Sequence, residues 1–430
     1  MFFEYELLIL VAMIGTIVLL NVACKLPTSV AMVGAALVGL VLGGWGYDLA
    51  DLFRHLFEGT FAFLDTALII STAMIFMFVV RASGAFEAIG AALVKGLHKH
   101  PIPLIFLLML LVVFPGMITG TASISVLCAG AIVAPILEMM GFDKVKAATF
   151  IAVGATLGMA APPVNIPAML IASSVDMTYS GFTGPLLTIT LIAAAIYTAC
   201  VGVRKVHSID LEQAKQELDF EIGKKYGLKI YLPIVLVVVI IGAVRIFPRY
   251  IPDLGMPLIF MLGSVVALFT GRKMKVLEVA STAMEENVSV LGKIMAIGMF
   301  LQVFILVGAR GFIVTNCIVL PMWLLFVACV ILMPVFGGIS VYGSASLFGP
   351  PLLLAMLGGN EIVVASALSV LAIIGEVMPP SALCANYSAD IVGVKYTDIL
   401  KRCPLAIAIT IVICFVFLVF SGSFGFLTAF

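Results

Sequence analysis

Two clusters rich in glycine, serine and threonine interrupt long apolar runs of this sequence, at residues 116–125 and 337–346. Glycine has no Cβ and lets a backbone leave helical geometry, which exposes carbonyl oxygens. Carbonyl and hydroxyl oxygens are the ligands that hard cations prefer, so the clusters predict Na⁺ sites. The candidate residues are Thr119, Gly120, Thr121 and Ser123 in the first cluster and Ser340, Gly343, Ser344 and Ser346 in the second.

Each cluster is followed by a Pro-Pro pair at the end of an apolar stretch. Proline removes a helical N–H and clashes with the preceding turn, so helix breaks are expected at 158–165 and 375–381. A broken helix offers carbonyls to a cation and a helix N-terminus to an anion. The candidates here are Gly158, Pro162, Asn165, Gly375, Pro379 and Ser381, and the metal ligands proper are Thr121, Ser123, Ser344 and Ser346.

A packing role is the alternative, because glycine, serine and threonine also let transmembrane helices approach closely. One cluster alone does not decide between the two; two clusters, each followed by Pro-Pro, favour a site. Among other polar residues, Glu376 is either a functional intramembrane acid or an interfacial one. Asn386 is either a ligand or a packing amide, and Asp65 and Asp390 are expected at loop edges.

The elements that would hold these residues occur twice. Residues 140–163 align with 357–380 without a gap and share seven identities, including the Pro-Pro pair. Upstream, Gly120–Ser123 resembles Gly343–Ser346 if a gap of about six residues is allowed. Chance similarity is the alternative in so apolar a sequence. A repeat predicts two equivalent halves, each with two interruptions, a Gly/Ser/Thr cluster and a helix broken at Pro-Pro.

Composition places these halves in a membrane. The 430 residues are 63% hydrophobic and 11% charged, with a mean hydropathy of +1.26, whereas soluble domains carry about 25% charged residues. Apolar runs at 7–24, 186–203 and 405–420 approach the roughly 20 residues that span a bilayer. We therefore expect an all-α polytopic membrane protein with ten to twelve segments. The net charge is zero, which gives no reason to expect a nucleic-acid partner.

The only long polar stretch divides the chain into a first half at 1–203, an amphipathic linker at 204–229 and a second half at 230–430. Cationic loops stay in the cytoplasm, so the linker is expected inside and the N-terminus outside; Arg245 and Arg249 run against this pattern. The halves then enter from opposite sides, as in transporters that alternate access. A further amphipathic segment at 84–100 fits a helix in the membrane interface, or a short connector.

The sequence contains no motif for catalysis, nucleotide binding or metal binding by histidine. The four histidines, at 55, 98, 100 and 207, lie beside loop charges without metal spacing, and no phosphate-binding loop or hydrolase motif occurs. The eight cysteines show no pairing pattern and are expected to pack. No cleaved signal peptide is expected. We predict no enzyme and no organic cofactor, with an ion gradient as the energy source.

Segments 114–123, 140–143, 158–167 and 375–380 resemble the large membrane subunit of TRAP (tripartite ATP-independent periplasmic) transporters, in the ion transporter superfamily. The resemblance implies an elevator-type carrier in the bacterial inner membrane. It also implies Na⁺ coupling, a small four-helix membrane subunit and a periplasmic binding protein that delivers an organic acid. The resemblance further implies two re-entrant hairpins that face the broken helices; carried over by position, their tips are 119–123 and 340–346.

One departure leaves alternatives open. Family members carry Phe-Thr-Pro-Thr-Glu-Ala after the first helix of the second half, whereas residues 251–257 here read Ile-Pro-Asp-Leu-Gly-Met-Pro. A stand-alone carrier of di- or tricarboxylates in the same superfamily is the second hypothesis. A membrane enzyme or assembly factor is the third.

Overall fold

A computed structural model describes residues 2–203, 206–247, 250, 252, 254–356 and 358–429, without the side chains of residues 2–4 and 245. No strand occurs in these ranges. The first half contains α1 (Phe2–Val18), α2 (Thr28–Gly43), α3 (Leu49–Thr60), α4 (Leu64–Ala82), α5 (Ala85–Leu97), α6 (Pro101–Thr119), α7 (Ala122–Ser125), α8 (Ala131–Met139), α9 (Lys144–Ala160), α10 (Ile166–Ser174) and α11 (Thr183–Val201).

Two short helices lie in the linker, α12 (Leu211–Glu217) and α13 (Glu221–Tyr226). Asp210 caps α12 by accepting a hydrogen bond from the Glu212 amide. The second half contains α14 (Leu232–Ile246), α15 (Met256–Thr270), α16 (Val276–Leu306), α17 (Ala309–Ile318), α18 (Met322–Ile339), α19 (Val341–Ala355), α20 (Glu361–Ile373), α21 (Leu383–Val392), α22 (Tyr396–Leu400) and α23 (Pro404–Val419).

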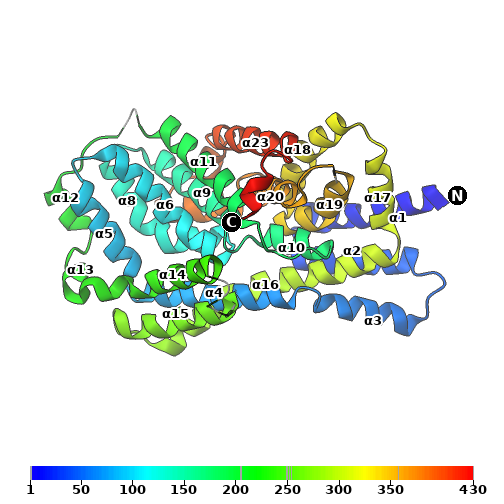
Figure 1. The fold of residues 1–430 in the computed structure, drawn as a ribbon, viewed down its shortest axis with the longest axis horizontal. Coiled ribbons are helices and arrows are strands. Elements are labelled where there is room, and N and C mark those ends of the chain that lie inside the picture. The colour runs from blue at the N-terminus through cyan, green and yellow to red at the C-terminus, as the bar shows by residue number, and fades with distance from the viewer. Residues whose placement is uncertain are drawn as a thin grey trace.

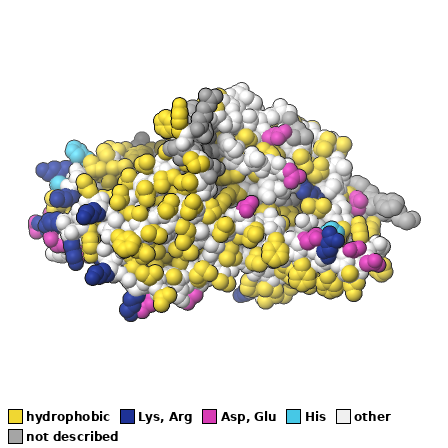
Figure 2. Space-filling view, turned by 60° about the horizontal axis from the view of Figure 1, so that its bottom comes forward, with side chains coloured by type: hydrophobic (Ala, Val, Ile, Leu, Met, Phe, Trp, Pro, Cys, Tyr) yellow, Lys and Arg dark blue, Asp and Glu magenta, His cyan; other side chains and the backbone are white. Residues whose placement is uncertain are grey.

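The expectation of many membrane-crossing helices is confirmed. Within the described ranges, eight helical segments are long and apolar enough to span a bilayer, and four shorter apolar helices accompany them. Large apolar side chains point outward, among them Val41 at 72% exposure and Phe269 at 83%. Figure 2 shows the broad hydrophobic face that results. Such a surface requires lipid around it.

The helices form two layers in Figure 1. In one layer α16, 31 residues long, packs along α2, α3 and α4, while α15 packs on α4 and α14 packs on α15. The other layer contains α6, α9, α11, α20 and α23. Helix α10 of the first half and helix α19 of the second pack on each other.

The two predicted hairpins approach the middle from opposite ends. Helices α6 and α8 occupy one end of the molecule, and α18 and α19 lie toward the other (Figure 1). The first hairpin packs on α9 through α6, and the second packs on α20 through α18. This arrangement brings each Gly/Ser/Thr cluster against the helix break of its own half.

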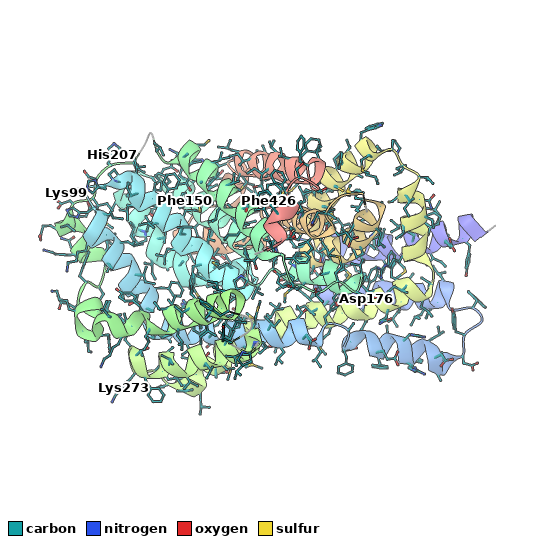
Figure 3. The ribbon with its side chains drawn as sticks, viewed as in Figure 1. Lys99, Phe150, Asp176, His207, Lys273 and Phe426 are labelled. Carbon is teal, nitrogen blue, oxygen red and sulfur yellow. The ribbon has the colours of Figure 1, made fainter. Side chains whose placement is uncertain are left out.

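The linker lies at the end that holds α5 and α8. Backbone hydrogen bonds join His207 to Met140 and Ile209 to His98, and the guanidinium of Arg272 pairs with Glu87 at 2.7 Å and Asp219 at 3.0 Å. Lys99, His207 and Lys273 mark this end in Figure 3. Several positions that the sequence argument used lie outside the described residues, among them Arg204, Lys205, Arg249, Ile251, Asp253 and Leu357.

Candidate transport site

The first helix break lies at 161–165 and is fully buried. Helix α9 continues through Gly158 to Ala160, so the break begins three residues later than expected. After the cis Pro162–Pro163 peptide, the Val164 amide donates to the Met117 carbonyl at 3.1 Å. The side-chain oxygen of Asn165 caps α10 by accepting a hydrogen bond from the Ala168 backbone amide at 2.9 Å. Its side-chain NH₂ group donates to the Ala160 carbonyl at 2.8 Å.

The second break has the same order of elements as the first, but part of it is exposed at the surface. Helix α20 ends at Ile373 and passes through a 3₁₀ turn over Ile374–Val377, which includes Gly375. After the cis Pro379–Pro380 peptide, Ser381 donates to the Gly338 carbonyl, from its amide at 3.0 Å and from its hydroxyl at 2.7 Å. Pro379 is exposed, whereas its counterpart Pro162 is buried.

The first hairpin turns at Gly120, whose φ of +66° is one that L side chains rarely adopt. On either side, the hydroxyls of Thr119 and Thr121 lie 3.1 Å apart, and Thr119 donates to the Pro115 carbonyl at 2.8 Å. Both threonines are buried, and Ser123 is half-buried in α7. The tip therefore presents two adjacent hydroxyl oxygens in a dry setting.

The second hairpin turns at Ser340 alone, which corrects the expected tip at 340–346. The Ser340 hydroxyl accepts from the Gly343 amide at 3.1 Å and starts α19 at Val341. Gly343, Ser344 and Ser346 therefore lie inside the helix. The hydroxyl of Ser344 donates to the Met333 carbonyl at 2.7 Å, and that of Ser346 to the Tyr342 carbonyl at 2.8 Å.

Glycines set the distance between each hairpin and its break. A Cβ on Gly158 would lie 2.5 Å from the Val113 carbonyl oxygen, and one on Gly375 would overlap the backbone of Gly337 and Gly338. Real Cβ atoms essentially never approach other atoms within 3.0 Å. In both halves, therefore, the two backbones touch at a position where only glycine fits.

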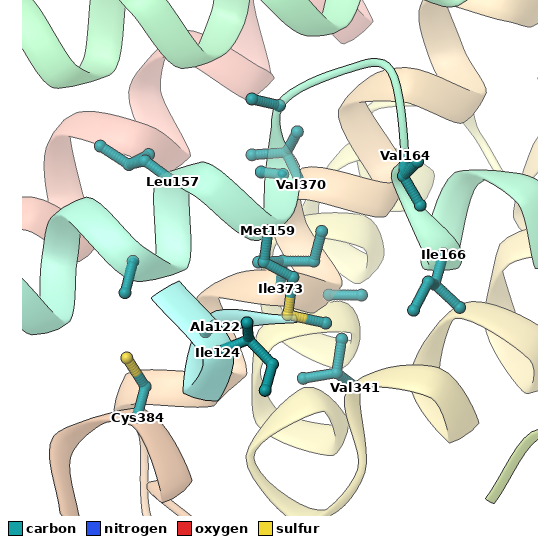
Figure 4. Close-up of a cluster of buried hydrophobic side chains, with 14 of the residues drawn as sticks. Ala122, Ile124, Leu157, Met159, Val164, Ile166, Val341, Val370, Ile373 and Cys384 are labelled. Carbon is teal, nitrogen blue, oxygen red and sulfur yellow. The ribbon is translucent and has the colours of Figure 1, made fainter. Parts of the chain in front are cut away.

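The segments of the two halves meet in the middle of the molecule. The Asn165 amide donates to the Ser369 hydroxyl of α20 at 3.2 Å, and the Ser388 hydroxyl of α21 donates to the Ala148 carbonyl of α9 at 2.6 Å. Figure 4 shows apolar neighbours of the tips and breaks in one buried cluster. These include Ala122, Ile124, Leu157, Met159, Val164, Ile166, Val341, Val370, Ile373 and Cys384.

No group of three or more histidine, cysteine or acidic side chains that could hold a metal ion occurs among the described residues. The polar side-chain atoms nearest the first hairpin tip are the hydroxyl oxygens of Thr119 and Thr121.

The family model described as the tripartite ATP-independent periplasmic transporter, DctM component, matches residues 3–187 and 112–422. The chain belongs to this family. It is thus the large subunit of a TRAP transporter, a multi-pass membrane protein that works with other subunits, and the prediction of a transporter rather than an enzyme is confirmed. A search of curated proteins gives no match.

Two solved structures share the fold of this DctM-family chain. The YdaH transporter of Alcanivorax borkumensis is 15% identical with a TM-score of 0.62, over 87% of this chain and 89% of that one. MtrF of Neisseria gonorrhoeae, described as illuminating a class of antimetabolite efflux pumps, is 15% identical with a TM-score of 0.61, over 91% and 94%. At this identity the likeness concerns the fold alone.

The structure of the DctM-family chain also corrects the hairpin alignment. The hydroxyl of Ser125 donates to the Val112 carbonyl, as that of Ser344 does to Met333. Ser125, and not a residue in Gly120–Ser123, is therefore the counterpart of Ser344. A signal was available, since Ser125 and Ser344 each follow a proline of the first limb, Pro115 or Pro334, by ten residues.

Two ambiguous polar residues now have positions. The side-chain amide of Asn386, in α21, donates to the Ser381 and Ala382 carbonyls, each at 3.2 Å. It therefore binds two carbonyls of the second break. Glu376 is half-buried in the 3₁₀ turn before the break. Ser369, the partner of Asn165, was missed because its role depends on a contact between halves.

Proposed function

We propose that this chain is the transport-carrying subunit of a Na⁺-coupled uptake system for an organic acid. The observation that carries the proposal is the same local arrangement in both halves. In each, the residue after Pro-Pro donates its amide to a hairpin carbonyl, Val164 to Met117 and Ser381 to Gly338. Paired hairpins and broken helices at one place are how secondary transporters expose oxygens and helix ends to their substrates.

The two halves act as inverted repeats in this proposal. The hairpins approach from opposite ends of the molecule (Figure 1), which supports entry from opposite membrane faces. The hairpins, with the broken helices α9–α10 and α20–α21, would move as the carrier of an elevator against the layer built around α16.

The charges support one orientation. Lys and Arg gather at the end that holds the linker (Figure 2), and the N-terminus lies at the other (Figure 1). Because cationic loops stay in the cytoplasm, the N-terminus would be periplasmic in a bacterial inner membrane. A small four-helix membrane subunit and a periplasmic binding protein would then complete the system.

Na⁺ would bind beside the hairpin tips. Its ligands would be Thr121 and Ser123 in the first half, and Ser344 and Ser346, in the first two turns of α19, in the second. Ser344 and Ser346 use their protons on carbonyls, which leaves oxygen lone pairs for a cation. The carboxylate of the substrate would lie near the N-terminus of α10, where the helix dipole favours negative charge.

A thermal shift tests this without knowledge of the substrate. The melting temperature of the purified chain should rise when Na⁺ replaces K⁺ at constant ionic strength, since an ion that binds only the folded state stabilises it by about 2.7 kcal/mol at a hundredfold excess over Kd. Thr121→Ala and Ser344→Ala should reduce the rise, and Cys200→Ala and Cys414→Ala should not. A flat wild-type response would remove the case for Na⁺, and equal effects of all four variants would remove the case for the hairpins.

A further inference from the structure

A hollow of about 270 Å³ lies between α5 and the end of the linker. Small residues leave the space open, since Ala88, Ala91 and Ala92 line it from α5 and two glycines line it from the linker side. The Tyr231 hydroxyl donates to the Ala88 carbonyl at 3.3 Å and closes one side. The hollow is thus framed by two separate elements and is not a dent in a single helix.

The hollow carries excess positive charge. Lys95 and Lys224 line it, and Lys225 and Lys229 are exposed on the neighbouring turns. Glu221 pairs with Lys224 at 2.6 Å and offsets one charge. Among the described residues Lys95 has no ion-pair partner. The acid on its own helix, Glu87, lies eight residues away, too far to pair with it, and is bound to Arg272.

Apolar side chains begin directly beside these lysines. Leu228 lines the hollow and is 85% exposed, and Leu232, one turn further, is 47% exposed. Both belong to the segment 221–244, a candidate membrane span that is only 17% buried within the chain. The hollow therefore lies where a polar linker enters the hydrocarbon, at the depth of lipid headgroups.

We propose that this hollow binds an anionic phospholipid. Its phosphate lies between Lys95 and Lys224, and an acyl chain runs along Leu228 and Leu232. Cations at headgroup depth attract anionic lipids of the cytoplasmic leaflet, and the long lysine side chains can reach that level while their stems stay in apolar contact. The bound lipid would join α5 to the linker at a place distinct from the transport site.

Thermal melting with defined lipids tests the proposal. The purified, delipidated chain in neutral detergent is melted with phosphatidylglycerol, with phosphatidylcholine or with soluble glycerol phosphate. Phosphatidylglycerol alone should raise the melting temperature. The double variant Lys95→Gln/Lys224→Gln should lose most of that rise. A matched control, Lys275→Gln/Lys401→Gln, removes two exposed lysines that also pair with acids three residues away, and should keep it.

A second variant tests the shape of the hollow. Ala92 is exposed and lines it, so Ala92→Leu should fill the space and reduce the rise without a change in charge. The proposal is overturned if phosphatidylcholine or glycerol phosphate gives the same rise, if no lipid gives one, or if the Lys95/Lys224 variant responds as the control does. The Na⁺ response should be the same in all these variants, so a failure here is distinct from a failure of the transport proposal.

Discussion

Replacement of Gly375 by alanine should severely disturb the contact between the second hairpin and its helix break. The added Cβ would fall well inside 3.0 Å of backbone atoms of Gly337 and Gly338. A flexible side chain could move away, but these atoms belong to the end of α18 and are tied by the Ser381 hydrogen bonds to the Gly338 carbonyl. Overpacking typically costs about 1–3 kcal/mol, and a backbone obstacle places Gly375→Ala at or above the upper value.

The matched control is Gly292→Ala in α16, where an added Cβ meets nothing within 4 Å. There the substitution should be neutral or stabilise the helix by up to about 1 kcal/mol, since alanine has the higher helix propensity. Melting of both purified variants in detergent, with and without Na⁺, provides the comparison. If Gly375→Ala melts at the temperature of Gly292→Ala, the close approach of hairpin and break is not as the structure has it.

Three further predictions concern single contacts. Asn165→Ala should cost about 2 kcal/mol in thermal unfolding, because a buried cap and a carbonyl lose their partner; wild-type melting would contradict the capping role. In a cysteine-free background, Leu383→Cys, 40% exposed, should react with a maleimide and Ile166→Cys, fully buried, should not until unfolded; equal labelling would refute the difference between the breaks. Burial raises the pKa of Asp143, but the Lys146 amide and the Arg402 guanidinium outweigh it and hold that pKa below its usual range. The stabilisation is present above about pH 4 and is lost as pH falls further. The acid-induced loss of unfolding free energy should therefore be smaller in Asp143→Asn, by less than about 1 kcal/mol because the pair is half exposed. Melting curves recorded against pH measure this, and an unchanged acid profile would contradict it.

The sequence predicts the membrane class and both helix breaks because each follows from local chemistry. A chain with so few charges cannot cover itself with a polar surface, and a Pro-Pro pair cannot continue a helix whatever surrounds it. The breaks at 161–165 and 378–382 therefore lie inside or next to the expected ranges. Composition and proline act within a few residues, so no knowledge of the tertiary contacts is needed.

The hairpin tips depend on contacts that a linear alignment does not contain. Residues 120–123 and 343–346 have similar sequences. However, Ser340 caps α19, so the second tip lies at Ser340, before the residues that align with the first tip. The role of Ser125 depends on a carbonyl 13 residues earlier. That of Ser369 depends on a residue 204 positions away. Spacing from the prolines at 115 and 334 finds the first of these, but nothing local points to the second.

The repeat is least accurate as a guide to exposure. Equivalent residues share hydrogen bonds, since Val164 and Ser381 both donate to a hairpin carbonyl, but one break is sealed and the other reaches the surface. Sequence similarity governs the local fold, whereas exposure depends on what packs outside it. Asn165 turns inward to Ser369, while the second break leaves Leu383 outward. Two similar halves in one chain therefore need not present similar surfaces.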